Sequence, residues 1–262
     1  MGTPFLFIMA ICVGFWAPDG KAGEVVEGKI YRSDDPAAAH EYLYESITRE
    51  APGGASLVST RYFDAQKKPL VVEESRYENG QINVYTYDQL QTKEKGRIEV
   101  KDGKVNYSFE SGGSTDTDDE TLEENSIVAD GIGQILKKHW ATIQAGDSVF
   151  VRFLFAERQD SIGFKFFKDE ERDYNGTPAV QVVMKPSSFI IAALAPSILL
   201  TVEKNPPNRL LEMRGRLPIR RALKDPPEKR SDWRAIDGRV VLSYRPLEET
   251  APQESAPKKA KN

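Results

Sequence analysis

The sequence predicts a mainly β protein of the α+β class, built on one large curved antiparallel sheet or open half-barrel of about ten strands. Apolar and polar side chains alternate from Leu57 to Phe109, as in strands with one buried face. Asn79-Gly80 and Asp102-Gly103 interrupt that stretch with strong hairpin-turn signals. Helical spacing follows later in the chain, so we expect an amphipathic helix and a short apolar helix to cover the sheet.

The first 22 residues predict a signal peptide that is removed after Ala22. Phe5 to Trp16 is almost wholly apolar, and Gly20 and Ala22 place small residues before the cut. The stretch is too short for a membrane-spanning helix, and a buried core segment is the alternative. Cys12 suggests a lipoprotein, but Ile11 precedes it where a small residue is expected. We therefore expect a periplasmic protein whose mature chain has no transmembrane span.

Cleavage after Ala22 would leave a mature chain without cysteine, because Cys12 is the one cysteine of the sequence. Disulfides, thiolate catalysis and cysteine-bound metals would then be excluded. The remaining length suits a single β-rich domain over residues 23–247. Residues 248–262 contain proline and lysine without an apolar period, which predicts a disordered tail.

The stretch from Glu110 to Asn125 has clustered carboxylates and no basic residue. We interpret it as a solvated loop between the first group of strands and a helix. A calcium site is the alternative, because carboxylates are hard oxygen ligands. The stretch lacks a D-x-D-x-D-G loop, so the loop interpretation is favoured.

A single amphipathic helix is predicted after this acidic stretch. Its apolar positions recur at helical spacing: Val128, Ile132, Ile135, Leu136 and Ile143. Asn125 or Ser126 can cap its start, and Gly146 is well placed to end it. His139 lies on the apolar stripe, where a histidine is more often a hydrogen-bonded core residue than a base or a metal ligand.

Strands resume after the helix. Outside the first group, the predicted strands are Glu27 to Arg32, Val149 to Phe155, Ile162 to Phe167, Ala179 to Met184, Leu210 to Leu217 and Arg239 to Tyr244. The polar stretch from Asp169 to Pro178 is predicted to separate two of them, with a turn at Asn175-Gly176.

The segment from Phe189 to Ala195 is apolar on every side and is stopped by Pro196. Ser187 or Ser188 can cap it as a short helix. A short helix that is apolar all round is usually buried, so we favour a place in the core. The alternative is a lid or mouth segment that meets a lipid tail or a membrane surface.

Basic residues gather in the region from Arg209 to Arg239. They are Arg214, Arg216, Arg220, Arg221, Lys224, Lys229, Arg230 and Arg234. We interpret them as a solvated strand face and loop. The alternatives are attraction to anionic headgroups or to the acidic stretch of the same molecule. The predicted export and the net charge of −4 argue against a nucleic-acid partner.

The sequence lacks the motifs that would indicate catalysis. It has no G-x-S-x-G elbow, no P-loop and no G-x-G-x-x-G after a strand. His139 and His40 are the two histidines, and neither lies in a zinc-binding pattern. We therefore predict no catalytic residue, no metal and no cofactor.

The order of elements resembles the periplasmic lipoprotein carriers. Short echoes are Gly146-Asp147-Ser148 opening a strand, Pro186-Ser187-Ser188 before the apolar segment, and Arg209-Leu210-Leu211-Glu212 leading to Gly215. The resemblance implies an open β-half-barrel that is lidded by helices and holds acyl chains. The long acidic stretch and the arginine-rich region depart from that family, and none of its functional residues transfers to this chain.

The leading hypothesis is an exported, non-catalytic protein that binds or carries a lipid or acyl chain in the cell envelope. An apolar cavity would suffice, because each buried methylene contributes about 0.8 kcal/mol. The candidate lining residues are Ile132, Ile135, Leu136, Trp140, Phe189, Ile190 and Leu194.

The alternative is a structural or interaction module with a packed barrel and an envelope protein as partner. An unrecognised hydrolase, with polar groups around His139, is a third hypothesis. The carrier requires a cavity under the helices, whereas the module requires interdigitated side chains there.

Overall fold

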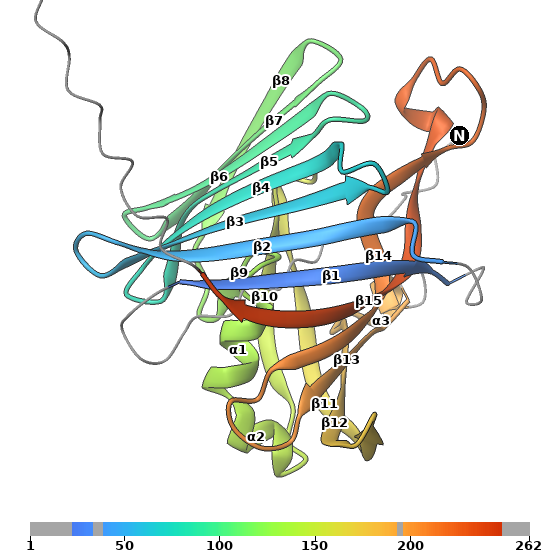
Figure 1. Cartoon of the computed structure of the whole chain (residues 1–262). Coiled ribbons are helices and arrows are strands. Elements are labelled where there is room, and N and C mark those ends of the chain that lie inside the picture. Colours follow the sequence, from blue (N-terminus) through green and yellow to red (C-terminus); the bar gives the residue numbers. More distant parts are fainter. Residues whose placement is uncertain (1–22, 34–38, 193–195, 248–262) are drawn as a thin grey trace, which may run out of the picture.

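The computed structural model describes residues 23–33, 39–192 and 196–247 (Figure 1). The predicted signal peptide and the predicted tail lie outside these residues. The first eight strands are β1 (Glu24–Arg32), β2 (Tyr42–Ala51), β3 (Ala55–Asp64), β4 (Pro69–Glu78), β5 (Gln81–Gln89), β6 (Glu94–Lys101), β7 (Lys104–Ser111) and β8 (Ser114–Thr121). The other strands are β9 (Ser126–Ile127), β10 (Val149–Phe155), β11 (Asp160–Tyr174), β12 (Thr177–Pro186), β13 (Ile198–Glu203), β14 (Leu210–Ala222) and β15 (Trp233–Pro246). The helices are α1 (Ile132–Lys138), α2 (Trp140–Gln144), α3 (Phe189–Ala192) and the 3-10 helix η1 (Arg230–Asp232).

All these strands belong to one 15-stranded sheet, so the predicted mainly β class and large open sheet are confirmed, and the predicted number of about ten strands is wrong. The sheet consists of two meanders, β8 to β1 and β15 to β10, joined by the antiparallel pair β1 and β15. Strands β8 and β9 form its edges, and β9 is parallel to β10. The sheet curls on itself, because β4 approaches β14, β5 approaches β9 and β8 approaches β11 (Figure 1).

The predicted two-residue turns are confirmed. Asn79-Gly80, Asp102-Gly103 and Asn175-Gly176 each have positive φ at both residues and connect adjacent paired strands. This is the geometry that matches the twist of hairpin strands. The predicted separation from Asp169 to Pro178 is wrong, because β11 and β12 extend as far as the turn itself.

The acidic stretch is a strand and not the predicted loop. Gly112 and Gly113 have φ of 60° and 84° and form a further hairpin turn, after which β8 pairs with β7 along its whole length. Strand β8 can be this polar because it is an edge strand whose side chains stay in water. Charged edge strands also resist pairing with the edge of another molecule.

The predicted single helix is two short helices. Ser126 and Ile127 pair with β10 instead of starting a helix, and α1 begins at Ile132. The helix breaks at His139, which has φ −114° and ψ 18°. Gly146 ends α2 as predicted, since its N–H donates to the Ile143 carbonyl and the Asp147 N–H to that of Thr142.

Candidate functional site

The barrel interior under α1 and α2 is the site that the carrier hypothesis requires. Ile132, Ile135, Leu136 and Trp140 are buried there and belong to one continuous core cluster with residues from both halves of the sheet. These four residues therefore lie on the face of the helices that covers the sheet. Any role in ligand binding stays a prediction.

The helices are also held to the sheet by polar contacts. The Tyr77 hydroxyl on β4 donates to the carboxylate of Asp130, just before α1. Trp140 Nε1 and Gln144 Nε2 on α2 both donate to the carbonyl of Lys204, at 3.3 and 2.8 Å. Both ends of the helical segment are thus fastened.

The predicted core position of the apolar segment after β12 is wrong for the residues that the structure describes. Phe189 is 88% exposed and Ile190 is 74% exposed, whereas Ile191 packs partly against the core. The reason is geometric, because a helix of four residues offers one side to the barrel and turns the other to solvent. Phe189 and Ile190 therefore do not line the interior, and Leu194 lies outside the described residues.

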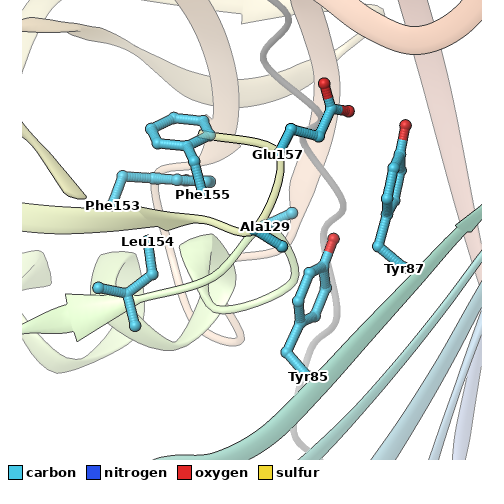
Figure 2. A pocket seen from close by; sticks show the side chains of 8 residues that line it. Tyr85, Tyr87, Ala129, Phe153, Leu154, Phe155 and Glu157 are labelled. Carbon is cyan, nitrogen blue, oxygen red and sulfur yellow. The ribbon is translucent and has the colours of Figure 1, made fainter. Parts of the chain in front are cut away.

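Aromatic side chains line a void of about 20 Å³ between the two walls of the barrel (Figure 2). This volume is about what one water molecule requires. Tyr85, Tyr87 and Glu157 present polar atoms near the void, and Phe153 and Phe155 pack on its other side with ring centroids 4.8 Å apart. A void of this size cannot hold an acyl chain.

The two walls of the barrel also come into direct contact. A Cβ atom added to Gly96 on β6 would lie 2.6 Å from the Ala156 Cβ, just after β10. A side chain at position 96 would therefore force one of the two walls to shift.

The inner face of the first meander is polar as well as aromatic. Ser46, Thr60, Glu73 and Ser75 are all buried on strands β2, β3 and β4. The Thr60 hydroxyl donates to Ser46 Oγ at 3.0 Å, and the Tyr85 hydroxyl donates to Glu73 Oε1 at 3.1 Å. Buried polar groups of this kind are stable when they bond to each other, and contact with an acyl chain would not replace those bonds.

A buried ionic cluster closes one end of the barrel. We use this name for Glu94, Glu157, Arg220 and Arg230. Arg220 Nη1 lies 2.7 Å from Glu94 Oε2, and both side chains are 1% exposed. Arg230 Nε lies 2.8 Å from Glu94 Oε1. Glu157 Oε2 lies 3.3 Å from Arg230 Nη2 and 3.4 Å from Arg220 Nη2. Arg220 and Glu94 are thus paired in the interior, as buried charges require, and Arg230 compensates the carboxylates from the solvent side, where its side chain is 47% exposed.

Hydrogen bonds to the backbone extend this connection. Gln89 and Gln91 donate to the carbonyls of Pro218 and Arg220, at 2.8 and 2.6 Å. The end of β5 and the turn after it are thereby fixed to β14, although these strands lie far apart in the order of the sheet.

Burial raises the pKa of Glu157, and the Arg220 charge opposes this effect. Burial and the Glu157 charge raise the pKa of Tyr87 well above its usual value.

Sequence reasoning missed this cluster. It placed Arg220 on a solvated strand face or loop, but Arg220 is among the largest fully buried side chains of the described residues. Its partners Glu94 and Glu157 are distant in sequence, so no local pattern marks them as partners. Other members of the basic set, such as Arg214 and Arg221, are exposed as predicted.

A cleft of about 570 Å³ opens beside α1, next to the tips of two hairpins. Its lining combines glycine backbone with Ser56, Tyr77, Gln134, Lys137 and Lys138, among others. Lys137 and Lys138 give the cleft basic groups, whereas most of the surface that lines it is apolar.

Asp130 lies close to this cleft, bonded to Tyr77. Asp130 is 3% exposed, and burial raises its pKa to about 6, against the hydrogen bond from Tyr77. Such a carboxyl can exchange a proton near neutral pH. Its burial and its bond to Tyr77 fit an anchoring role for the start of α1 better than contact with a ligand.

His139 lies at the break between α1 and α2 and is half-buried. Its Nε2 is buried without a hydrogen-bond partner, which differs from the predicted hydrogen-bonded core residue. Burial and Lys138 lower its pKa, and Glu124 opposes this effect. Within residues 23–33, 39–192 and 196–247, no group of three or more His, Cys, Asp or Glu side chains could hold a metal ion.

Comparison with known proteins gives a structural likeness but no sequence relative. No family model and no curated protein sequence matches the chain. Among solved structures, the chain is similar to a β-barrel-like protein of a domain of unknown function (DUF1849) from Brucella abortus. The identity is 9%, the TM-score is 0.44, and the match covers 92% of this chain and 100% of the other. No inference about function rests on this likeness, and the resemblance to lipoprotein carriers stays a prediction.

Proposed function

We propose that this protein is an exported, non-catalytic binding module of the cell envelope, whose packed barrel is a scaffold and whose partner binds on the surface. The observation that supports this most strongly is the interior. A carrier needs room for an acyl chain, whereas the void between Tyr85, Tyr87, Phe153 and Phe155 fits about one water molecule. Export remains a prediction from the first 22 residues.

The energy of opening the barrel favours the packed state. Lifting α1 and α2 would expose Ile132, Ile135, Leu136 and Ile143, which are buried against the sheet. At roughly 1.5 to 3 kcal/mol for each side chain, this would cost about 6 to 12 kcal/mol. A bound acyl chain with a dozen buried methylenes would return about 10 kcal/mol, from which the cost of association must be subtracted. The lipid would therefore gain too little to displace the helices.

The tryptophans of the mature chain allow a direct test. Cleavage after Ala22 would leave two tryptophans. Trp140 is the first residue of α2 and packs in the core, and Trp233 lies at the start of β15. A Trp233→Phe variant keeps Trp140 as the reporter, and a Trp140→Phe variant keeps Trp233 as the matched control. Titration with a brominated fatty acid quenches a tryptophan that the acyl chain contacts.

We expect no saturable quenching of Trp140, because the acyl chain has no access to the packed interior. Weak quenching that is the same in both variants would reflect non-specific contact with the surface. Saturable quenching of Trp140 alone would mean that the barrel admits the chain, and the carrier hypothesis would replace this proposal.

A further inference from the structure

Two apolar side chains project from the barrel at the end of β12. Phe189 and Ile190 are the most exposed large apolar residues among those that the structure describes. Exposed apolar side chains that lie next to each other mark a binding surface more often than scattered ones. We call these two residues the apolar tip.

A basic and aromatic patch lies on the outer face of β10, β11 and β12. It consists of Phe150, Lys165, Phe167 and Lys185, and Phe150 is 62% exposed. Strand pairing places Phe150 opposite Lys165 and Lys165 opposite Lys185. The Nζ atoms of the two lysines lie 5.4 and 5.0 Å from the centre of the Phe167 ring.

The two lysines of this patch have no carboxylate partner among the residues that the structure describes. Their contacts in this part of the chain are with the Phe167 ring. Like charges on directly opposed strand positions repel each other. An anion bound between or beside them would relieve that repulsion.

The apolar tip and the patch are neighbours. Phe189 follows Lys185 by four residues, which is at most about 14 Å of extended chain. The Ser187 N–H donates to the Gly163 carbonyl at 2.8 Å and so keeps the start of α3 against β11, two residues from Lys165. Figure 1 shows α3 apart from the hairpin of β7 and β8, although β8 approaches β11 and Glu123 pairs with Arg152 on β10 at 3.2 Å. Apolar insertion and positive charge are therefore available on one side of the molecule.

We propose that the apolar tip and the basic and aromatic patch dock the protein on the surface of an anionic lipid bilayer. Phe189 and Ile190 enter the boundary between headgroups and acyl chains, and Lys165 and Lys185 meet lipid phosphates. The tip consists of two largely exposed apolar side chains on a short helix, which suits insertion into a fluid interface. This inference rests on the proposed function, because it names the partner of the surface-binding module.

Co-sedimentation of the mature chain with vesicles of phosphatidylcholine, with and without phosphatidylglycerol, tests the docking. We expect binding that depends on phosphatidylglycerol and weakens as salt screens the lysines. F189S/I190S should lower the partition coefficient at least about tenfold, since two large apolar side chains are lost from the interface. K165Q/K185Q should lower it on the order of tenfold and remove the preference for the anionic lipid.

Matched controls come from other exposed positions. Leu223→Ser removes an apolar side chain that is also well exposed, and K67Q/K68Q removes two exposed lysines from another part of the surface. Both controls should bind vesicles like the unchanged protein. All the substituted tip and control side chains are largely exposed, and far-UV circular dichroism confirms that each variant is folded.

Vesicle binding that is absent, or that both double substitutions leave unchanged, would overturn the docking. Saturable binding to an envelope protein that needs Phe189 and Ile190 but no lipid would overturn it too. The proposed function fails in a different way. A lipid that remains bound to F189S/I190S without vesicles would occupy the barrel or the cleft beside α1, and it would refute a scaffold that holds no lipid, whatever the vesicle assay shows.

Discussion

Replacing Arg220 by alanine would remove the cation that two buried carboxylates share. Arg220 pairs with Glu94 and Glu157 and also hydrogen-bonds to Thr92 at 3.2 Å. Glu94 would keep Arg230 as its cation, but the Arg230 side chain is 47% exposed and contributes less in contact with solvent. The substitution therefore leaves negative charge in the interior with insufficient compensation.

The expected loss is large. Removal of one partner from a buried ion pair costs about 3 to 5 kcal/mol, because the remaining charge is uncompensated. For a domain of this size, such a loss lowers the Tm by roughly 6 to 20 °C. Arg220→Met keeps most of the buried volume, so a loss that persists in this variant comes from the missing charge and not from a cavity.

The loss should also depend on pH. Burial already raises the pKa of Glu157, and without the opposing charge of Arg220 that pKa rises further. A carboxyl whose pKa is raised in the folded state costs stability as the pH rises through that pKa, and costs little when it is protonated. The deficit of Arg220→Ala against the unchanged protein should therefore shrink as the pH is lowered.

Urea unfolding followed by tryptophan fluorescence, repeated at several pH values, measures both effects. Arg76→Ala serves as the control, because Arg76 and Glu78 form an exposed pair at 2.9 Å, and such pairs contribute about 0 to 1 kcal/mol. If Arg220→Ala lost no more than Arg76→Ala, or if its deficit were independent of pH, the cluster would not hold the barrel closed.

Three further substitutions test the interior. Leu136→Ala should cost about 2 to 5 kcal/mol in urea unfolding, because the packed barrel cannot close over the hole. Gly96→Ala should cost about 1 to 3 kcal/mol through its clash with Ala156, and Ala156→Gly in the same chain should restore most of that loss. Burial raises the pKa of Asp130 from 3.8 to about 6, so its carboxyl costs up to about 3 kcal/mol once the pH exceeds both values. The free energy of unfolding of the unchanged protein should therefore fall as the pH rises from 3.8 to about 6, and Asp130→Asn should remove this fall.

Each of these predictions has a clear contrary result. A small loss for Leu136→Ala would mean that the interior is already hollow. No rescue by Ala156→Gly would mean that the two walls of the barrel do not touch at Gly96. An Asp130→Asn variant with an unchanged pH profile would show that this carboxyl does not titrate between the two values.

Local features of the fold could be predicted from the sequence. Asn79 and Gly80 both have positive φ, and asparagine and glycine adopt this conformation more readily than other residues. The position of such a turn can therefore be predicted from two consecutive residues. Gly146 ends α2 for the same kind of reason. Gly112-Gly113 is also a hairpin signal, but the carboxylates after it made a solvated loop more plausible than an edge strand.

Features that depend on distant residues could not be predicted. Glu24 pairs with Pro246 at opposite ends of the domain, and no local pattern indicates that pairing. Whether the interior is hollow or packed depends on contacts such as that of Gly96 with Ala156. The exposure of Phe189 depends on how far α3 extends beyond the barrel, which its apolar sequence does not reveal.

Native mass spectrometry of the mature chain purified from the periplasm, with organic extraction of whatever stays bound, tests the packed-scaffold account most directly. The F189S/I190S variant, analysed in parallel, separates lipid held inside the barrel from lipid held at the apolar tip. The account predicts the mass of the bare chain for this variant and no stoichiometric lipid in its extract. One lipid per chain that survives in this variant would show a lipid site in the barrel or in the cleft beside α1 and contradict the account.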